Sequence, residues 1–484
     1  MAETAVPKIK ACVSARGQVD LSRAHFVGIG GTGMLPVARV CAERGFTVSG
    51  SDVRASEGLE ELVRLGVRVH TGHAAVHVPA NATAVVFTHV VGTDNQEIRE
   101  AQRRGIPLLH RSAALNALMA DRTAIGVLGS HGKSSTTGMM AFALSRMDQS
   151  PSFMVGADIE GPATGGRAGK GPFFVAEVDE SDRTHIGVSL QVAVLTNVAH
   201  DHPENYAGEI DHVDAYEECV RVGVRPGGTL VLSADSPGCR ELASRLVMAG
   251  DGPRMVTFGV SSSADWRLTD VASAGGHSAA VLRGPGALEF DLALRVPGVH
   301  QLLNAAGAVA ALHALGQDCG LAVEQLRYFD GVRRRMTPAG EAGGVRVFDS
   351  YAHHPDEVSA DLAAARTLLD DPSHRVITVF QPSGQPRLDA FGAELGAALA
   401  GCDQVVLTDS AQGVREGALK ELAGFVGRAG GAARFVETKR ADAVGRAASA
   451  ARPGDVVVLM GTGDLIESGP ILRDVLADLV AAAA

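Results

Sequence analysis

The sequence predicts an α/β fold divided into three domains. Strand-like runs alternate with amphipathic stretches, and this alternation restarts twice along the chain. At 484 residues the chain is too long for one ordinary core. Glycine is abundant at 58 residues while aromatic residues make up only 4%, which suits the tight strand-to-helix turns of α/β domains. We expect the domains to cover residues 1–120, 121–327 and 328–484.

The first series of elements begins at residue 24. "AHFVGIG" is typical of a buried strand that meets a glycine turn, and "MLPVARVCAERG" of the helix that follows. "FTVSGSD" then predicts a strand, "GLEELVRLG" a helix and "TAVVFTHV" another strand. Such alternation implies right-handed crossovers and a parallel sheet.

The second and third series follow the same scheme. "TAIGVLGSHGKSSTTGMMAFALSRM" predicts a strand, a loop and a helix, and "FFVAEVD", "VAVLTNV" and "GTLVLSAD" predict later strands. Shorter alternating runs between about residues 255 and 297 predict a small antiparallel patch. The third series starts at "VRVFDSYAHHPDEVSADLAAAR" and continues through "RVITVFQPS", "QVVLTDS" and "DVVVLMGTGD".

The charge balance narrows the class of protein. Lys and Arg number 44 against 55 Asp and Glu, a net charge of −11, which argues against a nucleic-acid or membrane-surface partner. The six cysteines form no C-x-x-C pair, so free thiols in a reducing cytosol are expected. No apolar run resembles a signal peptide or a bilayer span. We therefore expect a cytoplasmic enzyme that acts on small molecules.

The segment "GIGGTG", residues 28–33, has the G-x-G-x-x-G order between a strand and a helix, and Asp52 ends the next strand. Glycines let the backbone approach a diphosphate, and the helix start offers N–H donors. The pattern alone does not separate a packing turn, a nicotinamide nucleotide or a nucleotide sugar. A nicotinamide-dependent dehydrogenase is therefore one alternative, although it leaves the next motif unexplained.

The segment "GVLGSHGKSST", residues 126–136, ends like a phosphate-binding loop, with Gly132, Lys133 and Ser134 in the G-K-[ST] order. Its spacing from Gly129 is G-x-x-G-K-S, tighter than the usual G-x-x-x-x-G-K-[ST]. The lysine is placed to reach the β- and γ-phosphates of ATP, and the serine hydroxyl to bind Mg²⁺. A serine-capped helix start would explain the serines but not the lysine.

Acidic and imidazole side chains follow the next two predicted strands. They are Glu177, Asp179, Glu180 and Asp182 after the first, and His200, Asp201 and His202 after the second. In an open α/β sheet the carboxyl ends of the strands line the ligand crevice. These side chains are therefore candidates to hold Mg²⁺ against ATP, although imidazole is an unusual magnesium ligand.

Taken together, "HFVGIGGTGM", "GSHGKSST", "AEVDESD", "PGVHQLLNAAGAVAA", "FDGVRRRM" and "DSYAHHPDEV" resemble the Mur ligases, ATP-dependent amide-forming enzymes. The resemblance covers residues 25–464 in the family's order. It implies a Rossmann-like domain for a UDP-sugar, a central P-loop ATPase-type domain and a Rossmann-like C-terminal domain for the amino acid. It also implies that ATP and Mg²⁺ are used to join L-alanine or another amino acid to the carboxylate of UDP-N-acetylmuramate through an acyl phosphate.

The resemblance also implies a role for individual residues, with Lys133, Glu177, His202 and Arg335 in catalysis and Ser134, Glu177 and His202 as metal ligands. The residues expected to bind the nucleotide are Gly129, Ser130, His131, Gly132, Lys133, Ser134, Ser135, His300, Asn304 and Asp349. Those expected near the substrates are Gly30, Gly31, Gly33, Asp52, His73 and Arg111 for the UDP-sugar, and Tyr351, His353 and Arg387 for the amino acid.

The chain departs from the family pattern at "QPSGQPR", residues 381–387. The family has a histidine and an arginine where Ser383 and Gly384 stand, so Arg387 is the sole arginine that is kept. Loss of a guanidinium is not a conservative change, and it predicts a roomier and less cationic pocket for the amino acid. Restoring both side chains should shift the preference of the enzyme toward L-alanine. A paralogue that acts on another carboxylate acceptor and another amino acid is thus an alternative.

Two expectations concern the protein as a whole. A degenerate relative that binds nucleotide as a scaffold is the remaining alternative, against which the intact set of Lys133, Glu177, His202 and Arg335 argues. Because Arg335 follows the central domain in sequence, we expect the protein without ligands to be open, with Arg335 far from Lys133. We further expect Lys133→Ala to spare the fold, since no core contact is lost. The oligomeric state is left open.

Overall fold

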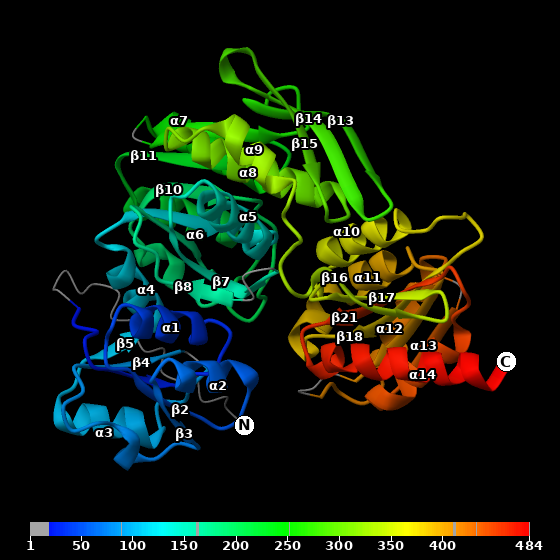
Figure 1. The fold of residues 1–484 in the computed structure, drawn as a ribbon, viewed down its shortest axis with the longest axis horizontal. Coiled ribbons are helices and arrows are strands. Elements are labelled where there is room, and N and C mark those ends of the chain that lie inside the picture. The colour runs from blue at the N-terminus through cyan, green and yellow to red at the C-terminus, as the bar shows by residue number, and fades with distance from the viewer. Residues whose placement is uncertain are drawn as a thin grey trace.

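A computed structural model of the chain describes residues 19–88, 90–160, 164–250, 252–409, 413–431 and 433–483. The strands form three sheets of five, ten and six strands, and each sheet falls within one of the three predicted ranges. The predicted α/β class is confirmed. In Figure 1 the N-terminal, central and C-terminal domains form three lobes, coloured blue, cyan to green, and yellow to red. No helix in these described residues is both long and apolar enough to cross a bilayer.

The N-terminal sheet is parallel throughout, with the order β3-β2-β1-β4-β5. The helices that connect its strands are amphipathic, and the side chains of Asn95 and Ser56 cap two of them. Its elements are β1 Ala24–Val27, α1 Leu35–Glu43, β2 Ser49–Asp52, α2 Glu57–Arg64, β3 Arg68–Thr71, η1 Ala75–His77, β4 Ala84–Phe87, α3 Gln96–Arg104, β5 Leu108–His110 and α4 Arg111–Met119.

The central sheet has the order β15-β14-β13-β12-β11-β10-β6-β9-β7-β8. The antiparallel patch is confirmed for β13–β15, whereas β12 pairs in parallel with both neighbours. Its strands are β6 Thr123–Leu128, β7 Ser152–Ile159, β8 Thr164–Arg167, β9 Phe173–Glu177, β10 Leu190–Leu195, β11 Val224–Ser233, β12 Arg254–Gly259, β13 Trp266–Ala274, β14 His277–Gly284 and β15 Leu288–Leu294.

The helices of the central domain bury the apolar faces of that sheet. Trp266, the one tryptophan of the sequence, is fully buried there beside Phe290 and His313. The helical elements are α5 Lys133–Arg146, η2 Thr184–Gly187, α6 Glu209–Gly223, α7 Pro237–Ala249, η3 Pro285–Ala287, α8 Val299–Ala314 and α9 Cys319–Leu326. The five cysteines of the described residues are unpaired and buried here and in the flanking domains, as expected of free thiols.

The C-terminal sheet has the order β16-β17-β21-β18-β19-β20, with only β16 antiparallel among these strands. Apolar side chains cover both of its faces, as a doubly wound sheet requires. Its elements are β16 Arg335–Ala342, β17 Val345–Ser350, α10 Pro355–Arg366, β18 Val376–Gln381, α11 Gln385–Leu399, β19 Gln404–Thr408, α12 Ala418–Arg428, β20 Ala433–Glu437, α13 Arg440–Ala450, β21 Val456–Gly461, η4 Asp464–Glu467 and α14 Ser468–Ala483.

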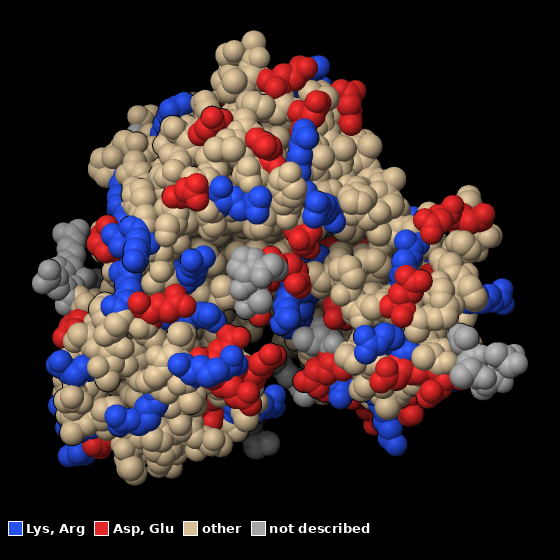
Figure 2. Space-filling model, viewed as in Figure 1, with Lys and Arg blue, Asp and Glu red and all other residues tan. Residues whose placement is uncertain are grey.

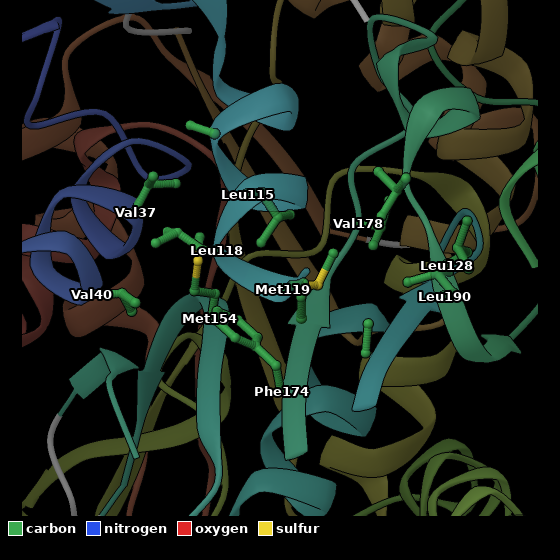
Figure 3. Close-up of a cluster of buried hydrophobic side chains, with 14 of the residues drawn as sticks. Val37, Val40, Leu115, Leu118, Met119, Leu128, Met154, Phe174, Val178 and Leu190 are labelled. Atoms are coloured by element: carbon green, nitrogen blue, oxygen red, sulfur yellow. The ribbon is translucent and has the colours of Figure 1, made fainter. Parts of the chain in front are cut away.

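The N-terminal and central domains share one hydrophobic core. Leu115 and Leu118 of α4 lie with Val37 of α1 against Met154 of β7 and Phe174 of β9 (Figure 3). All five side chains are at most 7% exposed. The C-terminal domain has separate apolar cores of its own. The first two domains are therefore expected to behave as one body.

This shared core makes a prediction about stability. Leu118 is 1% exposed, so Leu118→Ala should lower the free energy of unfolding by about 2–5 kcal/mol through lost burial and the cavity left behind. Urea unfolding followed by circular dichroism measures the effect. Ile210→Ala is the matched control, because Ile210 is 72% exposed and should change stability little. Equal losses in the two variants would contradict a shared core.

Candidate functional site

The three domains enclose a cavity of about 990 Å³. A hollow opens between the lower lobes in Figure 2, with acidic and basic side chains on both sides of it. The strand order β10-β6-β9 places the carboxyl ends of these three parallel strands side by side at the cavity. The phosphate loop follows β6, the acidic segment follows β9, and the histidine segment follows β10. The predicted crevice is therefore formed.

The phosphate loop is so tight that it requires glycine at two positions. Gly129 has φ 124°, and a Cβ there would lie 2.2 Å from Thr196 Oγ1. Gly132 has φ 82° at the start of α5, where a Cβ would lie 2.5 Å from Asn304 Oδ1. The Asn197 side chain accepts a hydrogen bond from the His131 amide at 3.0 Å and so supports the loop. The helix N-terminus thus faces the cavity with its N–H groups.

Lys133 lies at the start of α5 and bonds to a buried carboxylate. Its Nζ donates to Glu180 Oε1 at 2.8 Å and to the carbonyl of Gly129 at 2.6 Å. Burial alone would lower the pKa of Lys133, but the neighbouring Glu180, Asp179 and Glu177 carboxylates raise it above its ordinary value. Glu180 is fully buried. Lys133→Ala would strand the Glu180 carboxylate, so this contact argues against the expectation that the variant spares the fold.

Oxygen ligands gather beside the lysine. Ser134 Oγ donates to Glu177 Oε1 at 3.1 Å, which joins two of the predicted metal ligands. His202 lies instead with Asp179 and Glu180, and one donor atom of each lies within 4.8 Å of the others. The buried Glu180 Oε2 has no hydrogen-bond partner. These carboxylates suit a hard divalent cation such as Mg²⁺. The predicted ligand set omits Asp179 and Glu180, although the segment "AEVDESD" indicated both.

A second cavity of about 350 Å³ lies behind the phosphate loop. It is lined by residues predicted to contact the nucleotide, which come from the beginning and the end of the central domain's sequence: His131, Gly132, Ser135, His300 and Asn304. Asp361 of α10 completes the lining and lies with Oδ1 3.6 Å from His300 Nε2. Sequence reasoning missed Asp361, since nothing marks one carboxylate among several on an amphipathic helix.

Asp349 lies outside both cavities. Alternate residues of β17 face opposite sides of the sheet, so Asp349 shares the side of Val345 and Val347, which pack toward α14. Burial there raises the pKa of Asp349 to about 6. Ser350 faces the other side and donates a hydrogen bond to Asp361. The predicted contact of Asp349 with the nucleotide therefore has no support in this geometry.

The structure shows a closed arrangement of the central and C-terminal domains, and the expectation that the protein without ligands is open stays a prediction. Arg335 Nη2 donates to Ser134 Oγ at 3.2 Å, so the arginine already lies against the phosphate loop. His354 Nε2 donates to the carbonyl of His200 at 3.0 Å. Arg387 Nη2 lies 2.7 Å from Asp201 Oδ1, with the aspartate buried and the arginine side chain 14% exposed. These contacts between the central and C-terminal domains hold the closed arrangement together.

The residues expected around the amino acid lie at one end of the large cavity. Tyr351, His353, Ser383 and Arg387 all line it, although the Arg387 guanidinium faces Asp201 and His202. Burial lowers the pKa of His353 to about 4, so its ring is neutral near pH 7. Arg387 is thus shared between the cavity and the closure of the domains.

At the other end, Gly31, Gly33, Asp52, His73 and Arg111 line the cavity as predicted for a nucleotide-sugar site. Gly33 lets the Arg111 guanidinium approach closely, since a Cβ would lie 2.5 Å from Arg111 Nη1. Gly30 does not line the cavity, and its amide donates to Asp52 Oδ2 at 2.9 Å. The Asp52 carboxylate thus ties the glycine turn to the end of β2.

Sequence reasoning also missed the group that supports this end. Glu97 at the start of α3 is fully buried and accepts a hydrogen bond from Ser51 Oγ at 2.6 Å. Ser51 Oγ in turn lies 2.8 Å from His73 Nδ1. Burial opposes ionisation, but bonds from His25, Ser51 and the Ala74 amide lower the pKa of Glu97 to about 2. Only its three-dimensional position distinguishes Glu97 from an ordinary acidic residue in the first turn of a helix.

The fold and the site together define a three-domain phosphate-loop enzyme with a cluster of carboxylates beside the loop and two cavities around it. Comparison with known families agrees with this class. The Mur ligase family catalytic domain matches residues 23–123, the Mur ligase middle domain 127–312, and the Mur ligase glutamate ligase domain 334–463. The chain belongs to the Mur ligase family. A dehydrogenase is excluded by this membership.

Two relatives that match along nearly their whole length carry the same name. The UDP-N-acetylmuramate–L-alanine ligase of Streptomyces coelicolor is 41% identical over 459 residues, 94% of this chain and 98% of that protein. The enzyme of the same name from Kineococcus radiotolerans is 42% identical over 471 residues, 96% of this chain and 98% of that protein. The crystal structure of UDP-N-acetylmuramate-alanine ligase MurC from Thermotoga maritima is similar with a TM-score of 0.78 and 26% identity, covering 96% of this chain and 100% of that one.

The lysine–glutamate pair of the phosphate loop makes a second prediction. Lys133→Ala should lower the free energy of unfolding of the central domain by about 3–5 kcal/mol, because the buried Glu180 loses its partner. Thermal unfolding measures the change. Adding Glu180→Gln, which removes the stranded charge, should recover most of the loss. A single Lys133→Ala variant as stable as the wild type would contradict this reasoning.

A third prediction concerns the stability of the protein at acidic pH. Burial lowers the pKa of His185 to about 4, so the folded protein holds this ring neutral. A base whose folded pKa lies below its unfolded value of about 6.5 costs stability as pH falls from 6.5 toward 4. His185→Leu should flatten that loss, by up to about 3 kcal/mol for the full shift. Urea unfolding at pH 7 and pH 4.5 measures the free energy of unfolding at each pH. An equal loss of stability between these two pH values in the variant and the wild type would refute the prediction.

Proposed function

We propose that the protein is an ATP-dependent ligase that joins L-alanine to the carboxylate of UDP-N-acetylmuramate, with release of ADP and phosphate. One observation carries the proposal: a single cavity runs from the glycine turn and Arg111, past Lys133 and the carboxylate cluster, to Tyr351 and Arg387. A nucleotide sugar, a triphosphate and an amine can therefore meet in it. The names of the relatives, at 41–42% identity over 94–96% of the chain, support the same substrates.

The reaction proceeds in two balanced steps. A carboxylate oxygen of UDP-N-acetylmuramate attacks the γ-phosphorus, an acyl phosphate forms and ADP leaves. The amine nitrogen then attacks the acyl carbon, the nitrogen loses a proton, and phosphate leaves as the amide forms. Lys133 precedes Ser134 at the start of α5 and Arg335 donates to the Ser134 hydroxyl, so both cations would neutralise phosphoryl oxygens there. Such chemistry needs positioning and charge neutralisation more than covalent help from side chains.

The residues present fit Mg²⁺. Ser134 and Glu177 would hold one ion beside the phosphate loop, and Asp179, Glu180 and His202 offer a second donor set with an unpartnered carboxylate oxygen. Bound there, Mg²⁺ supplies charge neutralisation to the phosphates. The nucleotide base and ribose are assigned to the second cavity, between His300 and Asn304 on one side and Asp361 on the other.

The proposal predicts strict dependence on both substrates. Phosphate should be released only when ATP, Mg²⁺, UDP-N-acetylmuramate and an amino acid are all present, with mass spectrometry of the product identifying the amine. We expect L-alanine to be used, and the variant Lys133→Ala/Glu180→Gln to release at least ~10²-fold less phosphate. Phosphate release without an amine, or none with any of the common amino acids, would reject the ligase assignment and favour the nucleotide-binding scaffold or a different acceptor.

The altered pocket favours a second candidate, a ligase with a broader choice of amine. Ser383 lines the cavity beside Tyr351, and its side chain is small. Gly384 has φ 150°, so an arginine there would be strained, and restoring both family side chains is not a clean test. The single substitution Ser383→His is the cleaner test.

We therefore predict that the wild type accepts larger amino acids alongside L-alanine, since a missing packing contact is worth only about 1–3 kcal/mol of discrimination. Ser383→His should raise the ratio of kcat/KM for L-alanine over that for a larger amine such as L-leucine by about 10-fold or more. Competition assays with paired amines measure the ratio. A wild type already strictly selective for L-alanine would exclude the broader enzyme.

A further inference from the structure

Two histidines from different domains face each other behind the phosphate loop. His131 belongs to the loop of the central domain, and His354 precedes α10 of the C-terminal domain. Their ring centroids lie 4.4 Å apart. Asp356 Oδ2 lies 4.0 Å from His131 Nε2 and 3.8 Å from His354 Nδ1. One donor atom from each of the three residues thus lies within 4.8 Å of the other two.

The surrounding contacts set the tautomers of both rings. His131 Nδ1 lies 3.4 Å from Glu357 Oε1, and a carboxylate accepts, so Nδ1 carries the proton and Nε2 keeps a lone pair. That Nε2 is buried and has no hydrogen-bond partner. His354 Nε2 donates to the carbonyl of His200 at 3.0 Å, so the lone pair of this ring is on Nδ1. Nδ1 accepts only a long 3.3 Å bond from the Asp356 amide.

The unpartnered lone pair of His131 Nε2 and the lone pair of His354 Nδ1, which holds only the long bond from the Asp356 amide, therefore face the Asp356 carboxylate. The other nitrogen of each ring faces a carboxylate or donates to a backbone carbonyl. This is the outer shell that metal-binding histidines have in proteins. Asp356 is exposed, with 68% of its side chain accessible, so it is free to move the short distance that bond lengths of about 2.0–2.2 Å require. The 350 Å³ cavity, which His131 and Asp356 line, provides access for an ion.

We propose that His131, His354 and Asp356 form a binding site for a transition-metal ion of the Zn²⁺ class, completed by water. Two imidazole nitrogens and one carboxylate suit Zn²⁺, Co²⁺ or Ni²⁺, whereas Mg²⁺ prefers the oxygen-rich cluster around Glu180. The ion would join the phosphate loop directly to α10. It would therefore oppose any separation of the central and C-terminal domains, and metal binding would report on their closure.

The test is a Co²⁺ titration of the full-length protein in an excess of Mg²⁺, which occupies the oxygen-rich cluster. The wild type should develop the intense visible absorption of four-coordinate Co²⁺, and Zn²⁺ should abolish it at one equivalent. Asp356→Asn keeps the exposed position and the helix start, and should weaken Co²⁺ binding at least ~10-fold. His354→Ala should remove the absorption, with circular dichroism confirming that the variant is folded.

His202→Gln serves as the matched control, because it alters the other histidine-containing cluster. It should leave the Co²⁺ spectrum unchanged. The proposal is overturned if the wild type shows no such absorption, if Asp356→Asn and His354→Ala bind as the wild type does, or if His202→Gln abolishes binding. The experiment uses no nucleotide, sugar or amino acid, so its result does not depend on the proposed ligase activity.

Discussion

The site depends on one topological constraint, the adjacency of β10, β6 and β9 in the central sheet. Parallel strands end at the same edge, so the segments that follow these three strands must meet. Lys133 follows β6, Glu180 follows β9 and His202 follows β10, and the three side chains come within hydrogen-bonding or ion-pairing distance. The glycines of the phosphate loop serve the same constraint, because Gly129 lies against Thr196, the residue that follows β10.

The two interfaces of the central domain differ in kind. Toward the N-terminal domain the contact is an apolar core shared by α4, β7 and β9 (Figure 3), and exposing such a surface to water would be costly. Toward the C-terminal domain the contacts are hydrogen bonds and ion pairs, such as Arg387 with Asp201 and Arg335 with Ser134. Water can replace polar contacts of this sort. The third domain is thus the part of the enzyme able to move during a catalytic cycle.

The sequence was sufficient for the strands, the turns and the residues at the sheet edge, because periodicity and glycine position are local signals. It was insufficient where a side chain's role depends on which way it faces. Asp349 and Ser350 are neighbours in β17, yet only Ser350 lies on the side of the nucleotide cavity. Glu97 and Asp361 are ordinary acidic residues in sequence, and their roles become evident only from partners far along the chain. The closed arrangement of the domains could likewise not be predicted from the sequence, since it depends on the pairing of Arg387 with Asp201 across a domain boundary.

Charge pairing in the large cavity ties these features together. Lys133 pairs with Glu180, Arg111 with Asp179, Arg387 with Asp201 and Arg335 with Glu357, so each of these cations faces a carboxylate. A triphosphate alone would bring like charge to the carboxylates, which is unfavourable in a buried site. A triphosphate that arrived with divalent cations would bring both signs: carboxylates beside the phosphate loop would become metal ligands, and Lys133 and Arg335 would turn to phosphoryl oxygens. Because such an exchange would replace the ion pairs of Lys133 and Arg335 in kind, it would let the cavity bind a highly charged substrate without leaving these buried charges unpaired.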